Sequence, residues 1–256
     1  MPERNNKTAF NLASAFFQGN VTLNLLAIGV LVVVGLLQMV PILGIIFAFA
    51  YPILSLAVQV YVAKAIPDTP SPDALAQKAK DAKVSDLFTT YLDVAAGGFV
   101  GLFTIAMVFM ILFMLLLSGT VNIQAMQTGD MQAVAVSMMS AGALGTMSVF
   151  MLIAMFLGYV FPGVMGEVVT SSDFGEAFKK SFYLLSPAFW KRTFNGAYFK
   201  LVFIWSIVVF VAALVLSWIA ASILLLPVAL VGAYFLALYN AAVYRFAKEK
   251  LTNLAS

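Results

Sequence analysis

Residues 36–66 read LLQMVPILGIIFAFAYPILSLAVQVYVAKAI, two apolar runs separated by the short motif PILG at residues 41–44. About 20 apolar residues in a helix are enough to cross the roughly 30 Å hydrocarbon core of a bilayer. The first run extends back to residue 22 and the second ends at Lys64, which predicts spans at 22–40 and 44–64 joined by a tight turn. A hairpin of two transmembrane helices (22–64) is therefore the basic unit of this sequence.

The same pattern recurs at residues 94–169 and 196–246, where two further pairs of apolar stretches predict two further hairpins. An amphipathic segment precedes each hairpin, most clearly where Phe174, Phe178 and Phe182 recur at helical spacing. We therefore predict an all-α integral membrane protein with six transmembrane helices in three hairpins. Each hairpin is expected to follow an amphipathic helix that lies in the cytoplasmic interface of the membrane. The stretch before residue 169 is too long for one upright helix, so it is either tilted or begins as an interfacial segment.

The second helices of the three hairpins resemble one another: YPILSLAVQVYVAKA begins at residue 51, FPGVMGEVV at 161 and LYNAAVYRFAK at 238. An internal repeat with pseudo-threefold packing would explain this similarity, and so would the periodicity that unrelated helical hairpins share. The polar segment 67–83 is the one candidate linker, and it is too short to be a soluble domain. Residues 1–256 are thus predicted to form a single polytopic membrane domain.

The positions of the 14 Lys and Arg residues predict the topology. They lie before residue 8, within 64–83, within 179–200, and from 245 onward, so that all can face one side. Basic residues in short loops favour the cytoplasmic side of a membrane. We therefore expect a multi-pass protein of the cytoplasmic (inner) membrane of a prokaryote, with both termini in the cytoplasm.

Composition excludes several classes of function. Apolar residues make up 63% of the chain and charged residues 10%, well short of the roughly 25% in soluble domains. Without His or Cys, the usual zinc, haem and iron–sulfur ligand sets are missing, so no metal site and no cofactor are expected. No paired carboxylates or activated nucleophile were found within the spans, so we expect no catalytic residues and no enzyme. The basic residues flank apolar runs instead of forming an arm, which argues against nucleic acid as a partner.

A few polar side chains near the cytoplasmic ends of the spans are candidates for contact with a ligand or a lipid headgroup. They are Gln59, Glu167, Asn240 and Arg245. In one interpretation they form a vestibule in which Arg245 meets a phosphate. In the other, Glu167 and Arg245 are an ordinary interfacial ion pair.

A second set of residues is predicted to contact the membrane surface. It consists of Phe174, Phe178, Lys179, Lys180, Phe182, Lys191 and Arg192. The aromatic members form an apolar stripe, and the basic members either attract anionic headgroups on the cytoplasmic side or only fix the orientation of the chain.

These patterns favour a non-enzymatic membrane protein that binds or moves lipid, or another hydrophobic molecule, at a cavity on the cytoplasmic side. A scaffold or accessory subunit of a membrane complex is an alternative, with a protein partner or a second copy docking on an exposed small-residue face at Gly97 and Gly101. A further alternative is an immunity-type membrane protein whose contacts lie in the external loop 120–132.

Residues 36–66 and the stretch SSDFGEAFKKSFYLLSPAFW at 171–190 resemble an uncharacterised prokaryotic membrane family, domain of unknown function 4013. More distantly, the chain is similar to the membrane domains of glycerophosphodiester phosphodiesterases and to Yip-type bundles. The resemblance implies a six-helix bundle of the inner membrane and supplies no catalytic residues. The long approach to the fourth span departs from the compact pattern of that family.

Overall fold

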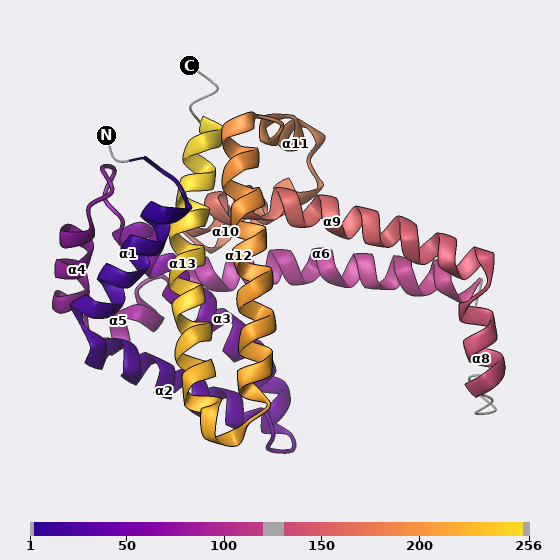
Figure 1. Ribbon diagram of the computed structural model, residues 1–256, viewed down its shortest axis with the longest axis horizontal. Helices are drawn as coiled ribbons and strands as arrows, with labels where there is room; N and C mark the ends of the chain where they lie inside the picture. Colours follow the sequence, from indigo (N-terminus) through magenta and orange to yellow (C-terminus); the bar gives the residue numbers. More distant parts are fainter. Residues whose placement is uncertain (1–2, 120–130, 253–256) are drawn as a thin grey trace.

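The computed structural model describes residues 3–119 and 131–252, and every regular element in these ranges is helical (Figure 1). The first half contains α1 (Asn6–Gly19), α2 (Val21–Leu37), α3 (Leu43–Ala65), α4 (Pro72–Asp81), α5 (Val84–Thr89) and α6 (Leu92–Ser118). The second half contains α8 (Met131–Met138), α9 (Ala141–Val169), α10 (Phe174–Ser181), α11 (Pro187–Thr193), α12 (Gly196–Ala220) and α13 (Leu226–Thr252), with short 3₁₀ turns at Phe182–Leu185 and Ile223–Leu225. The prediction of an all-α chain is confirmed for these ranges.

Within the described ranges, five helical segments are long and apolar enough to cross a membrane, and α1 with α2 forms a bent sixth candidate. By helix length and hydropathy the chain is therefore a multi-pass membrane protein. The stretch before residue 169 is broken at residues 139–140, between α8 and α9. It therefore begins as a separate short helix, and the position of that helix in the membrane interface stays a prediction.

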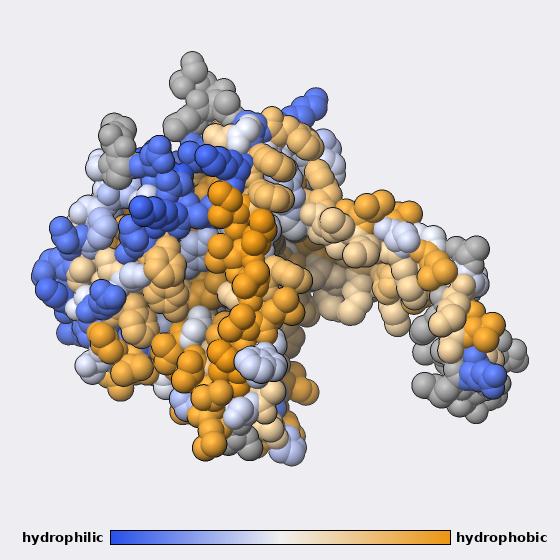
Figure 2. Space-filling view, in the orientation of Figure 1, coloured by the Kyte–Doolittle hydropathy of each residue, from blue (hydrophilic) through white to orange (hydrophobic). Residues whose placement is uncertain are grey.

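The helix pairs α2–α3, α6–α9 and α12–α13 are each in contact. In Figure 1, α12 and α13 lie side by side, whereas α6 and α9 extend away from them toward α8. The first and last described residues lie near the start of α12 and the end of α13, and we call this end of the molecule the terminal face. Hydrophilic residues gather over α1, α4 and the terminal face, while α12 and the α6–α9 pair present mainly hydrophobic residues (Figure 2). The pseudo-threefold relation between the hairpins stays a prediction.

The axes of α1 and α2 meet at an angle of 95°, and two asparagines satisfy the backbone at this bend. Asn20 caps α2, since its Oδ1 accepts from the backbone N–H of Leu23. Asn24 is fully buried, and its Nδ2 donates to the carbonyl oxygens of Phe16, Phe17 and Asn20 at 2.8–3.3 Å. Its Oδ1 accepts from the Tyr234 hydroxyl at 2.9 Å. The end of α1, which would otherwise expose unpaired carbonyls, is thus bonded to α2, and α2 is bonded to α13.

Replacing Asn24 with leucine is expected to lower the free energy of unfolding by about 3 kcal/mol, because buried carbonyls and the Tyr234 hydroxyl lose their partner. Asn11→Leu is the matched control, since Asn11 is exposed on α1. Thermal denaturation in detergent, followed by intrinsic fluorescence, measures both variants. Equal melting temperatures for the two would contradict the assigned role of Asn24.

The segment 67–83, expected as a polar linker, contains a helix that packs against α1. Ser71 caps α4, and Leu75 and Ala79 of α4 are fully buried. At Gly19 the two helices approach so closely that a Cβ atom would lie 2.7 Å from the carbonyl oxygen of Ala76. The alternating Ala, Lys and Asp of this segment reflect one buried face and one solvated face of a short helix.

Amphipathic helices precede the hairpins as predicted. The apolar side of α1, however, packs mainly against other helices of the protein. Leu12, Ala13 and Phe16 are buried because α4 and α13 cover them, whereas Phe10 is 53% exposed. In α5, Leu87 and Phe88 are buried as well. These two helices are therefore packed into the bundle, and their apolar residues are core residues.

Glycines permit the closest helix contacts. A Cβ atom at Gly97 of α6 would overlap the carbonyl oxygen of Phe174, and one at Gly101 would lie 2.6 Å from the Cβ of Ser181. Because α10 covers both glycines, the expected exposed small-residue face is not available to a partner, and that part of the scaffold hypothesis is wrong. The small side chains serve close packing within the chain instead.

Candidate functional site

Glu167, near the end of α9, lies at the centre of a buried ion-pair cluster. It is 7% exposed, and its Oε2 lies 3.3 Å from Lys248 Nζ of α13 and 3.6 Å from Lys180 Nζ of α10. Lys248 also donates to Thr170 Oγ1 at 2.6 Å. Lys64, at the end of α3, donates to the carbonyl oxygen of Ser171 at 2.5 Å. Three helices, α3, α10 and α13, thus converge on the end of α9, and these contacts hold the four helix ends together.

The start of α10 is organised by Asp173 and Glu176, whose three-residue spacing in the sequence is that of a capping box with Asp in place of Ser or Thr. Asp173 Oδ1 accepts from the backbone N–H of Glu176 at 2.9 Å, and Glu176 Oε2 accepts from that of Ser172 at 2.5 Å. Glu176 also pairs with Lys180 at 2.7 Å. The Lys180 ammonium group, followed by the bonds from Ser172, lowers the pKa of Glu176 to about 2. Glu176 therefore stays ionised at neutral pH and helps orient Lys180.

Arg245 belongs to a different cluster on the terminal face. It lies 3.1 Å from Glu249 one turn further along α13, and 3.1 Å from the 98% exposed side chain of Asp68. Glu249 also pairs with Arg4 at 2.5 Å. Glu167 and Arg245 were predicted either to line one vestibule or to pair with each other. In the described ranges each has its own partners, and no ion pair joins them.

The two neutral members of the predicted set are engaged in local hydrogen bonds. Gln59, half-buried in α3, donates to the carbonyl oxygen of Ser55 in its own helix at 3.4 Å. Asn240 accepts from the indole N–H of Trp205 at 2.8 Å and so links α13 to α12. The structure therefore does not gather Gln59, Glu167, Asn240 and Arg245 around one cavity. Their contact with a headgroup stays a prediction.

The predicted membrane-surface set is partly engaged within the protein. The rings of Phe174, Phe178 and Phe182 form a continuous row with centroid separations of 6.3 and 5.2 Å, and Phe174 is 43% exposed. Lys180 instead points at Glu167 and Glu176. The remaining basic members, Lys179, Lys191 and Arg192, are exposed, and Arg192 lies over the Phe189 ring. Contact of this surface with lipid stays a prediction.

A pocket of about 550 Å³ lies on the terminal face, where the segment before α1 meets α12 and α13. We call it the lysine pocket. Its lining residues are Glu3, Arg4, Asn5, Asn6, Lys7, Ala197, Lys200, Leu201, Ile204 and Lys250. Asn6 holds the three segments together, since it donates to the carbonyl oxygen of Leu201 at 2.9 Å and accepts from the Tyr239 hydroxyl.

The charges of the lysine pocket are incompletely neutralised. Arg4 pairs with Glu249 outside the lining, whereas Lys7, Lys200 and Lys250 have no ion-pair partner among residues 3–119 and 131–252. Glu3 is the one carboxylate among the described residues of the lining, and its Oε2 accepts from the Asn5 side chain at 2.8 Å. Leu201 and Ile204 lie further along α12 and supply an apolar wall. The pocket thus combines an excess of positive charge with aliphatic surface.

Sequence reasoning did not find the lysine pocket, because its basic residues are separated by nearly the whole chain. Lys7, Lys200 and Lys250 were expected only as markers of orientation. Their convergence depends on the docking of the segment around Asn6 against α12 and α13, for which the sequence contains no local signal.

No protein-family model, curated protein or solved structure matches this chain. The resemblance to the family domain of unknown function 4013 therefore stays a prediction. The hypothesis of an immunity-type protein rests on the loop 120–132, of which residues 120–130 lie outside the described part of the chain.

Proposed function

We propose that this multi-pass membrane protein binds an anionic phospholipid, with the headgroup in the lysine pocket and an acyl chain along α12. The observation that supports it most directly is the convergence of Lys7, Lys200 and Lys250 on one concave site beside Leu201 and Ile204. Phosphate is a strong acceptor of charge-assisted hydrogen bonds from such groups. The aliphatic wall suits the hydrocarbon that continues from a headgroup.

The position of the pocket agrees with that of a lipid headgroup. Lys200 lies within the first turns of α12, a helix long and apolar enough to span the membrane. Its side chain can extend toward water while its stem contacts apolar surface. In this proposal the terminal face is cytoplasmic, as the placement of Lys and Arg favours. Anionic lipids of that leaflet attract each nearby basic residue by roughly 1 kcal/mol.

The test is lipid binding by a variant that carries Lys7→Gln, Lys200→Gln and Lys250→Gln together. Native mass spectrometry of the detergent-purified protein titrated with phosphatidylglycerol gives the affinity. Loss of three attractive charges, at roughly 1 kcal/mol each, is expected to weaken binding by roughly 150-fold. Phosphatidylcholine, whose headgroup is zwitterionic, is expected to bind weakly to the parent protein and to the variant alike.

The matched control removes the same number of charges from α4 and its end, through Lys78→Gln, Lys80→Gln and Lys83→Gln. These three side chains are exposed and lie outside the lysine pocket. Their loss is expected to change phosphatidylglycerol affinity by less than about threefold, because well-separated surface charges are screened. An equal loss in both triple variants would mean that net charge, and not the pocket, attracts the lipid.

A further inference from the structure

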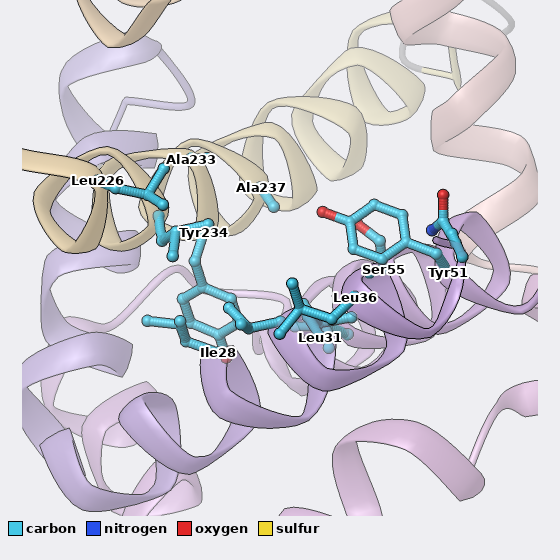
Figure 3. Close-up of a pocket in the computed structure, with 14 residues that line it drawn as sticks. Ile28, Leu31, Leu36, Tyr51, Ser55, Leu226, Ala233, Tyr234 and Ala237 are labelled. Carbon is cyan, nitrogen blue, oxygen red and sulfur yellow. The ribbon is translucent and has the colours of Figure 1, made fainter. Parts of the chain in front are cut away.

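A second cavity, of about 400 Å³, lies between α2, α3 and α13 and is unrelated to the lysine pocket. Ile28, Leu31 and Leu36 of α2 form one wall, and Leu226, Ala233 and Ala237 of α13 form another (Figure 3). Its volume lies within the usual range for small-molecule sites. Among the residues that the structure describes, its lining contains no Asp, Glu, Lys or Arg. An occupant must therefore be uncharged and mainly apolar.

Two hydroxyl groups on α3 line this cavity at helical spacing. Tyr51 and Ser55 are four residues apart, so they share one face of α3 with Cβ atoms about 6 Å apart. In Figure 3 the Tyr51 ring points from α3 toward the side of the pocket formed by α13. Neither hydroxyl has a hydrogen-bond partner among the described residues, whereas the Tyr234 hydroxyl in the same lining is bonded to Asn24. Tyr51 is 39% exposed.

The depth of these hydroxyls makes their lack of a partner informative. Tyr51 lies eight residues and Ser55 twelve residues after the start of α3, so they are roughly 12 and 18 Å along a spanning helix. At that depth water is scarce, and a hydroxyl in hydrocarbon without a hydrogen bond is costly. In a phospholipid the charged headgroup holds the ester groups near the interface, too far from Ser55 to meet it. A neutral molecule with a deeply placed acceptor would satisfy both groups.

We propose that this cavity binds a neutral membrane lipid whose small head carries carbonyl groups, with Tyr51 and Ser55 donating to those carbonyl oxygens. The apolar walls of α2 and α13 then contact the hydrocarbon tail. The ring of a quinone and the head of a diacylglycerol both present this chemistry. Binding involves no bond formation and no electron transfer.

The experiment titrates the full-length protein in nanodiscs with two probes in separate arms, a benzoquinone with a decyl tail and dioctanoylglycerol. Quenching of intrinsic tryptophan fluorescence, checked by native mass spectrometry, reports binding. We expect saturable binding of at least one probe. The probe with the higher affinity shows whether the carbonyl groups belong to a quinone or to a diacylglycerol. Tyr51→Phe with Ser55→Ala should weaken that binding about tenfold, because two hydrogen bonds are lost.

Tyr183→Phe with Ser118→Ala is the matched control, since it also removes one Tyr hydroxyl and one Ser hydroxyl, both of which lie outside the cavity. This control is expected to bind like the parent protein. Size-exclusion profiles of both double variants confirm that they are folded, which conservative removal of two oxygen atoms should permit. Failure of both probes to bind, or unchanged affinity in the Tyr51 and Ser55 variant, overturns the proposal. Because the lysine pocket is untouched, phosphatidylglycerol binding remains a separate readout.

Discussion

Gly166→Ala is expected to lower the melting temperature of the detergent-solubilised protein by roughly 5 to 10 °C. Gly166 lies on the face of α9 that packs against α13, and an added Cβ atom would overlap the carbonyl oxygen of Tyr244. It would also lie 2.9 Å from the Cβ of Lys248. Backbone cannot move aside as the end of a side chain can, so the two helices must separate. Overpacking of this kind costs about 2 to 3 kcal/mol.

Gly158→Ala on the same helix separates this effect from helix propensity. Nothing lies within 4 Å of a Cβ atom at Gly158, and alanine is favoured over glycine within a helix by about 1 kcal/mol. This variant should therefore melt at the same temperature as the parent protein or a little above it. If the two alanine variants melted alike, the close approach of α9 to α13 near Tyr244 would be refuted.

Element type and span position could be predicted because hydrophobicity and capping act locally. The runs on either side of residues 41–44 become α2 and α3, and Asp173 caps α10 as its spacing indicates. The bend between α1 and α2 could not be predicted, because it depends on bonds from Asn24 to carbonyls of α1 and to Tyr234 of α13. The sequence shows Asn24 near the start of a span but not which carbonyls lie within its reach.

The sequence indicates which polar residues lie near the ends of the long helices, but not which of them are in contact. Glu167 and Arg245 were expected to lie in one cluster, but they belong to two clusters, because the clusters depend on which helices meet. Glu167 faces Lys248 and Lys180 instead of Arg245, because α13 presents Lys248 to the end of α9 while Arg245 points at Asp68 and Glu249. Residues 245 and 248 lie three positions apart on one helix, and only tertiary packing decides which of them meets Glu167.

Glu167→Gln is expected to lower the free energy of unfolding by about 2 kcal/mol. The substitution keeps the shape of the side chain but removes the charge that faces Lys248 at 3.3 Å and Lys180 at 3.6 Å. Loss of one partner from a fully buried pair costs about 3 to 5 kcal/mol. The effect here is smaller because both ammonium groups are partly exposed and retain other contacts, Lys180 with Glu176 and Lys248 with Thr170.

Asp68→Asn provides the control, since it removes one carboxylate from an ion pair whose acidic side chain is 98% exposed. Exposed pairs contribute about 0 to 1 kcal/mol, so this variant should melt close to the parent protein.

A second comparison tests the pairing of Glu167 with Lys248. In the background of Lys248→Met, the charge on Glu167 has lost its nearer partner, so Glu167→Gln should cost about 1 kcal/mol less than in the parent. Additive effects of the two substitutions would show that Glu167 and Lys248 do not interact. The contact of α9 with α13 would then rest on the glycine packing and on uncharged contacts such as the hydrogen bond from Lys248 to Thr170, and the charge on Glu167 would have Lys180 as its remaining partner.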